Sequence, residues 1–173
     1  MIAVQSVPNI QELKTFINDA FEVIDPNDSK KFTEAGNGQS SIDDWFSVEA
    51  IPSYLNKGKL LEARNDKGEL VGAGFIGMQN PISWPDGKKA KLFLIAVSPE
   101  YRNQGVGKLL LVEAENMAKL MGSKKLIINV HVFQEQTHKW YQRQGYKEMG
   151  VLNNYYDNGS AKFFYKDLQD QAL

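Results

Sequence analysis

The chain has 173 residues, a mass of 19.5 kDa and a formal net charge of −1 at pH 7. Hydrophobic residues make up 42% and charged residues 24%, a balance that supports a packed core and argues against disorder. The near-zero net charge argues against a protein whose main task is to neutralise nucleic-acid phosphates. The absence of cysteine excludes disulfides, thiolate metal sites and cysteine nucleophiles, and two histidines give no basis for a histidine-rich metal site.

Two further features concern location and charge distribution. No apolar run approaches the roughly 20 residues of a membrane span, and the N-terminus lacks a basic start followed by an apolar stretch. We therefore expect a cytoplasmic protein with no membrane or nucleic-acid partner. Residues 1–58 carry nine acids and four bases, whereas residues 59–173 carry 12 acids and 16 bases. This division suits a cationic ligand on one side and an anionic one on the other, and chance on a solvated surface explains it equally well.

Hydrophobic periodicity divides the chain near residue 59. Apolar residues recur at a spacing of three to four in the first helical segment and at a spacing of two after residue 59. A buried-type strand, a helix and a second buried-type strand then form a βαβ unit, which sets the two strands parallel. The pattern predicts an α/β fold with a mixed sheet and helices on both faces. In chain order, we first predict a strand at 2–7, a helix from Pro8 to Ile24, a loop at 25–40, and a helix from Ser41 toward Ala50 that Pro52 interrupts. Three strands follow, at 59–65, 70–79 and 91–97, separated by turns at 66–68 and 80–90. The rest of the chain is predicted as a loop at 98–107, a helix at 108–121, a strand at 125–132, a helix at 136–144, and strands at 146–151 and 161–168 around a polar turn at 153–160.

A glycine-bearing loop, Arg102–Gly107 (RNQGVG), lies between the buried strand and the following helix. Helix N-termini present unpaired N–H groups and a partial positive charge, and glycines let the oxygens of an anion approach the backbone. No Gly-Lys-Ser/Thr ends the loop and no third glycine follows, so neither a nucleoside-triphosphate loop nor a dinucleotide fingerprint is present. Taken alone, the loop indicates either a phosphate site or a tight turn.

Two stretches in this order resemble one known family. Ile95–Gly107 (IAVSPEYRNQGVG) resembles the acyl-CoA-binding signature of the GNAT superfamily of N-acetyltransferases, and Trp140–Tyr146 (WYQRQGY) resembles its second signature. The pair is more specific than either stretch alone, and the predicted order of elements is also similar. The resemblance covers essentially the whole chain. It implies one GNAT-like domain over residues 1–173, with a central mixed sheet of about seven strands flanked by helices.

The resemblance also implies a set of residues that bind acetyl-CoA. The pyrophosphate is expected on the backbone amides of the glycine loop, and the pantetheine arm is expected to pair like an extra strand with the strand before it. That pairing requires the strand to separate from its parallel neighbour. Gln134 stands where the family often has Asn, and Thr137 where a small Ala is usual, which affects the fine geometry of the arm. The residues expected to bind the cofactor are Ile95, Ala96, Val97, Arg102, Asn103, Gln104, Gly105, Val106, Gly107, Asn129, Gln134 and Tyr141.

The implied reaction is direct transfer of acetyl from acetyl-CoA, as co-substrate, to a primary amine of a small molecule, peptide or protein, with no metal. Tyr141 is the residue expected to protonate the leaving thiolate. At pH 7 the neutral form costs about 4–5 kcal/mol for a lysine-like amine and about 1 kcal/mol for an α-amine. His131 is a candidate catalytic base, with a packing or surface role as the alternative, and His138 is expected at the surface.

The acceptor is not identified by the sequence. A non-catalytic acyl-CoA-binding regulatory module is the alternative function, because no general base is evident, and a homodimer is left open. Aromatic residues could line an acceptor pocket or belong to the core: Trp45, Phe46, Tyr54, Trp84, Tyr155 and Tyr156.

Overall fold

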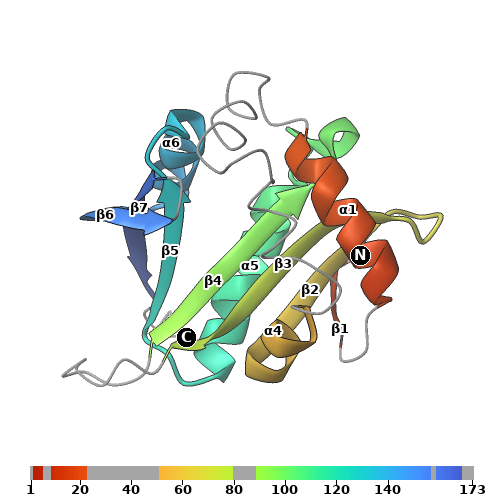
Figure 1. Cartoon of the computed structure of the whole chain (residues 1–173). Helices are drawn as coiled ribbons and strands as arrows, with labels where there is room; N and C mark the ends of the chain where they lie inside the picture. The colour runs from red at the N-terminus through yellow and green to blue at the C-terminus, as the bar shows by residue number, and fades with distance from the viewer. Residues whose placement is uncertain (1, 6–8, 23–50, 80–88, 157–158, 169–173) are drawn as a thin grey trace.

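A computed structural model describes residues 2–5, 9–22, 51–79, 89–156 and 159–168 (Figure 1). The predicted loop at 25–40, the helix predicted from Ser41 and most of the predicted turn at 80–90 lie outside the described residues. None of the described helices is long and apolar enough to cross a membrane. The elements are β1 (Ile2–Gln5), α1 (Ile10–Glu22), α4 (Ile51–Lys57), β2 (Gly58–Arg64), β3 (Leu70–Gln79), β4 (Lys89–Val97), the short 3-10 helix η1 (Pro99–Tyr101), α5 (Val106–Leu120), β5 (Lys125–His131), α6 (Glu135–Arg143), β6 (Lys147–Tyr156) and β7 (Gly159–Asp167).

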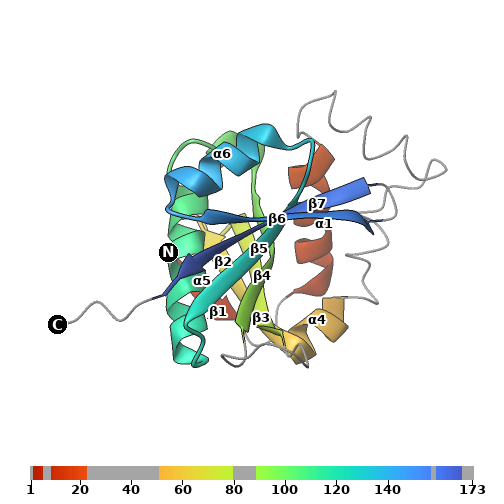
Figure 2. The ribbon, with the colours of Figure 1, turned by 90° about the vertical axis from the view of Figure 1, so that its left-hand side faces the viewer.

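Within the described residues, seven strands form one sheet in the order β1-β2-β3-β4-β5-β7-β6. The neighbours β4 and β5 are parallel, and every other neighbouring pair is antiparallel. Figure 2 shows α5 on one face of the sheet and α1 with α4 on the other. The predicted fold class, a mixed α/β sheet flanked by helices, is confirmed, and so is the parallel pair joined by a helix.

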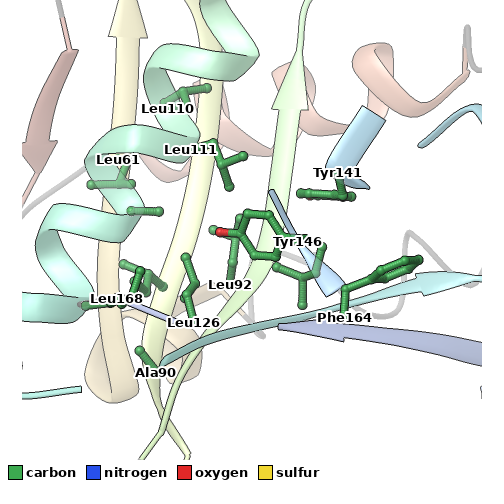
Figure 3. Packing of buried hydrophobic residues seen from close by; sticks show 14 of the residues in the cluster. Leu61, Ala90, Leu92, Leu110, Leu111, Leu126, Tyr141, Tyr146, Phe164 and Leu168 are labelled. Carbon is green, nitrogen blue, oxygen red and sulfur yellow. The ribbon is translucent and has the colours of Figure 1, made fainter. Parts of the chain in front are cut away.

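Two apolar clusters hold the helices to the sheet. Residues Leu110, Leu111 and Ala114 on the inner stripe of α5 pack on Leu92 and Leu126 of the central strands (Figure 3). Full burial of one leucine side chain contributes about 1.5–3 kcal/mol, so this stripe fixes α5 against the parallel pair. The second cluster lies on the opposite face, between α1 and strands β2 to β4, and includes Leu13, Phe16, Ile17, Ala20, Leu60, Phe75, Leu94 and Ala96.

Two predicted boundaries are wrong. Helix α4 begins at Ile51 and contains Pro52, whereas the sequence predicts that Pro52 interrupts a helix. Proline is tolerated in the first turn of a helix, because the missing N–H has no partner within the helix there. The predicted polar turn at 153–160 is also too long, since β6 continues to Tyr156 with an irregular register after Leu152. The other predicted boundaries lie within two residues of the observed ones where the structure describes them.

A β-bulge in β4 changes which side chains face which helix. Phe75 of β3 pairs with Leu94 and Ile76 pairs with Leu92, so Phe93 is the additional residue on β4. Before the bulge, Leu92 faces α5, whereas after it Leu94 packs in the α1 cluster. Phe93 itself is 38% exposed. The alternation of residues in the sequence does not predict this bulge.

Candidate active site

The parallel strands β4 and β5 pair over a short distance and then separate. Their register runs from Ala90–Leu126 to Leu92–Ile128, while β4 continues to Val97 and β5 continues to His131. Figure 1 shows the two strands meeting at their lower ends and diverging upward, with α6 above β5. The separation predicted from the resemblance is therefore confirmed, and it leaves the end of β4 unpaired by β5.

The glycine loop turns the chain from β4 into the start of α5. Gly105 is the N-cap of α5 and has φ +89°, a left-handed conformation that glycine adopts without steric cost. Within the described residues, no side chain caps the first turn of α5. The first amides of the helix therefore keep their N–H groups available for an anion, and the helix dipole adds partial positive charge at the same place.

A cavity of about 640 Å³ lies where these elements meet. The end of α1, the end of β4, the glycine loop and α6 surround it. Eight of the residues predicted to bind the cofactor line it, and five predicted site residues, Gln104, Val106, Asn129, His131 and Gln134, are not among its lining residues. The lining residues are Ala20, Phe21, Ile95, Ala96, Val97, Arg102, Asn103, Gly105, Gly107, Lys108, Gln136, Thr137, Trp140, Tyr141, Arg143 and Gln144.

The side chain of Arg102 holds two walls of this cavity together. Its Nη2 donates a hydrogen bond to the backbone oxygen of Ala20 at 2.6 Å, and its Nε donates to the backbone oxygen of Val97 at 3.3 Å. Ala20 lies in the last turn of α1, where carbonyl groups lack partners within the helix and a cation is favourable. Burial lowers the pKa of Arg102. The family resemblance implies a role only for the backbone of Arg102, and no local sequence signal points to this side-chain contact.

Tyr141 projects from α6 into a closely packed corner. It is 4% exposed and lines the cavity, and its ring meets the Tyr146 ring edge to face at 5.5 Å between centroids. The Tyr146 hydroxyl donates to Glu115 at 3.3 Å, and Lys166 binds both oxygens of the same carboxylate at 2.9 Å. Burial, with the Glu115 charge as the second cause, raises the pKa of Tyr146, so this hydroxyl stays protonated. Figure 3 shows Tyr146 among the residues of the α5 cluster, which fixes the surroundings of Tyr141.

The two histidines lie together, and neither is among the lining residues of the cavity. His131 is 5% exposed, and its ring centroid lies 4.0 Å from the ring centroid of Phe133. His138 is 7% exposed, and its Nε2 donates to the backbone oxygen of His131 at 2.9 Å. The prediction that His138 lies at the surface is wrong, because its side of α6 packs toward β7, with the Phe164 ring 5.6 Å away. Burial lowers the pKa of His138. The role of His131 as a base stays a prediction.

The fold of this chain is shared with solved acetyltransferases. The chain superposes on the PaiA N-acetyltransferase of Thermoplasma acidophilum, solved in complex with coenzyme A, with a TM-score of 0.71 and 20% identity. The alignment covers 96% of this chain and 99% of that one. A sequence profile of the acetyltransferase (GNAT) family matches residues 19–146, and the chain belongs to that family. The resemblance seen in the sequence is thus confirmed.

Curated relatives match over shorter stretches. An amino-acid acetyltransferase of Vibrio cholerae is 34% identical over 88 residues, which are 50% of this chain and 18% of that protein. An N-alpha-acetyltransferase of Sulfurisphaera tokodaii is 32% identical over 77 residues, which are 44% of this chain and 46% of that protein. The chain therefore matches less than half the length of either of these two relatives.

Proposed function

We propose that this chain is an acetyl-CoA-dependent N-acetyltransferase that transfers acetyl directly to a primary amine of a small molecule or peptide. The observation that carries the proposal is the cavity beside the end of β4, with a glycine turn and helix N-terminus among its walls and Tyr141 facing it from α6. A non-catalytic acyl-CoA-binding module would need the same cavity without the turnover. Family membership supports both readings, and turnover separates them.

The described residues suit coenzyme A as a co-substrate. A diphosphate would take hydrogen bonds from the first amides of α5, and the exposed residue Lys108, a cation, lines the same cavity. The edge of β4 from Ile95 to Val97 has no strand pairing to β5, so an extended pantetheine arm can add to it. The volume of about 640 Å³ is in the range of roughly 300–1,000 Å³ that small-molecule sites occupy.

The proposed transfer needs one proton donor and one neutral amine. The amine nitrogen attacks the thioester carbonyl carbon, the carbon–sulfur bond breaks, and the Tyr141 hydroxyl gives its proton to the leaving thiolate. The amine loses a proton as the amide forms. Because His131 does not line the cavity, a water chain is the simpler route for that proton, and it suffices for an α-amine, whose neutral form costs only about 1 kcal/mol at pH 7.

Two measurements test the proposal. Calorimetry should detect acetyl-CoA binding, and a thiol-release assay with a panel of amines should detect transfer. Tyr141→Phe should keep acetyl-CoA affinity within about twofold and lower kcat by about 10²–10⁴-fold. Tyr165→Phe, at a tyrosine of β7 that does not line the cavity, is the matched control and should leave both values unchanged.

The outcomes separate the two functions. No acetyl-CoA binding at millimolar concentration would end both. Binding without transfer to any amine in the panel would favour the regulatory module.

A further inference from the structure

The face of the sheet that α1 and α4 cover includes a region beside β5 where a lysine lies among aromatic residues. On β5, Leu126, Ile128 and Val130 face the α5 cluster, so the alternating residues Ile127 and Asn129 face the other side. Helices α1 and α4 pack on that side against β2, β3 and β4. Residues from β4, β6 and β7 gather beside β5 on this same side, and one of them is a lysine.

Lys91 of β4 is only 4% exposed, and two aromatic rings lie near its ammonium group. Its Nζ donates a hydrogen bond to the Tyr155 hydroxyl at 3.0 Å and lies 5.1 Å from the Phe93 ring centroid and 5.4 Å from that of Tyr155. Both distances are within the roughly 6 Å over which a cation is attracted to an aromatic face. Tyr155 is held in turn by the Phe163 ring, edge to face at 5.1 Å.

Among the residues that the structure describes, no neighbour neutralises the charge of the Lys91 ammonium group. An ammonium has three donors, and in the described ranges the Tyr155 hydroxyl is its one hydrogen-bond acceptor and no carboxylate forms an ion pair with it. Lys125 shows the contrast, since it lies 4.9 Å from the Tyr165 ring centroid and also pairs with Asp167. A buried cation without a counter-ion is costly, and a bound anion would remove that cost.

The position of Lys91 relates this charge to the transfer site. Lys91 lies one residue before Leu92, the last residue of β4 that pairs with β5, and Phe93 of the bulge follows directly. The cavity begins on the same strand at Ile95, about 10 Å along the sheet from Lys91, because the β3 partners of these two residues, Gly77 and Gly74, are three residues apart. An anion held by Lys91 would therefore lie where the strands part, at the end of the gap away from the glycine loop.

We propose that Lys91, between Phe93 and Tyr155, binds a carboxylate of the acceptor, so that the substrate is an amine that also carries an acid group. This inference rests on the proposed acetyl transfer. Phe93 and Tyr155 enclose the carboxylate and exclude water from it, and the amine extends from there toward the cavity. An acceptor without an anionic group leaves the lysine charge uncompensated and binds less tightly.

Matched pairs of acceptors test the proposal directly. Each common amino acid is assayed as the free acid and as its carboxamide, and spermidine is included as a polycationic amine. The best free acid should exceed its amide by at least about tenfold in kcat/KM, which is the scale of one hydrogen bond to a charged group. Lys91→Met should raise KM for that acid about 10–100-fold, keep kcat within about threefold and leave the amide unchanged.

Further variants guard against loss of folding. Lys91→Arg keeps the cation and should keep the acid preference. Tyr155→Phe removes only a hydroxyl and should weaken the preference less than Lys91→Met. Lys125→Met is the matched control, because it also removes a lysine beside a tyrosine ring, and it should leave the preference unchanged.

A binding measurement separates this inference from the proposed function. Calorimetry with N-acetylated amino acids and their amides, in the presence of coenzyme A, requires no turnover. If amines are acetylated but acids and amides are equal, or spermidine is preferred, the inference is overturned and the transferase stands. If no amine is acetylated, the binding data alone decide. The inference is supported if the acids bind more tightly than the amides and Lys91→Met abolishes that difference. It is overturned if acids and amides bind equally.

Discussion

The side chain of Arg102 gives the sharpest test of how the cavity is built. Its guanidinium donates to the backbone oxygens of Ala20 and Val97, so it joins the end of α1 to the end of β4. If this is its main role, the geometry of the planar group matters more than its charge. Arg102→Met and Arg102→Lys should then both destabilise the fold. Methionine donates no hydrogen bond, and lysine keeps the charge but cannot donate to both carbonyl oxygens as the planar guanidinium does.

The expected loss follows from the two hydrogen bonds. A hydrogen bond to a charged group contributes about 1.5–3 kcal/mol, and the contact at 3.3 Å belongs near or below the lower end of that range. We expect Arg102→Met to lower the free energy of unfolding by about 2–4 kcal/mol and Arg102→Lys by at least half as much. For a chain of this length, each kcal/mol lowers Tm by about 2–4 °C.

Chemical denaturation and calorimetric titration with acetyl-CoA at two salt concentrations form the assay. Lys108→Met serves as the control, because Lys108 is an exposed cation that lines the cavity beside the glycine loop. It should leave stability unchanged while weakening acetyl-CoA binding and reducing its salt dependence. The reasoning is refuted if Arg102→Lys has wild-type stability, or if Arg102→Met loses salt dependence of binding as Lys108→Met does.

Two other predictions concern a backbone conformation and a titration. Gly105→Ala places a Cβ at φ +89°, where no atom lies within 4 Å of it, so backbone strain alone should cost about 1–2 kcal/mol, measured by urea unfolding. Gly107→Ala, at a glycine without positive φ, is its control, and equal losses would contradict the strain argument. Burial depresses the pKa of His138 below its ordinary 6.5, so the unfolded chain binds a proton first as the pH falls. Stability should therefore be full above about pH 7 and decline below pH 6.5 in the wild type. His138→Gln should flatten that decline in denaturation curves at pH 5.5 and 7.5, and an unchanged slope would show that another group is responsible.

Local patterns predicted the parts of the fold that depend on local chemistry. Strand β3 has the predicted bounds Leu70–Gln79, because alternating apolar residues follow a glycine turn. Residues 108–121 were predicted as a helix from one apolar stripe, and the observed α5 differs only at its ends. Four residues of the glycine loop, together with Tyr141, which the family resemblance marked, line one cavity.

The features that were missed depend on contacts between distant residues. The Arg102–Ala20 bond joins positions 82 residues apart, and no local pattern reports such a partner. His138 reads as a surface residue on a short polar helix, yet the side of α6 that carries it packs toward β7. Lys91 lies in an apolar strand, and the hydroxyl to which its buried ammonium donates belongs to Tyr155, 64 residues further along the chain.

The β4 bulge affects both the separation of β4 from β5 and the packing of β4 side chains on the two faces of the sheet. Without the extra residue Phe93, Leu94 would face α5, and Ile95 would face the α1 side. With it, Ile95 packs toward the α5 cluster while Leu94 packs under α1. A bulge also increases local twist, and β4 stops pairing with β5 one residue before Phe93.

Glycine at position 77 of β3 makes this arrangement sterically feasible. A Cβ there would lie 3.1 Å from the Phe93 ring and 2.7 Å from the backbone oxygen of Lys57. Any larger residue would push against Phe93, which packs beside the Lys91 ammonium. The room that Gly77 leaves therefore permits the bulge. The bulge lies between the strand edge proposed to bind coenzyme A and the lysine proposed to bind the acceptor. These two proposed sites therefore depend on one local irregularity of the sheet.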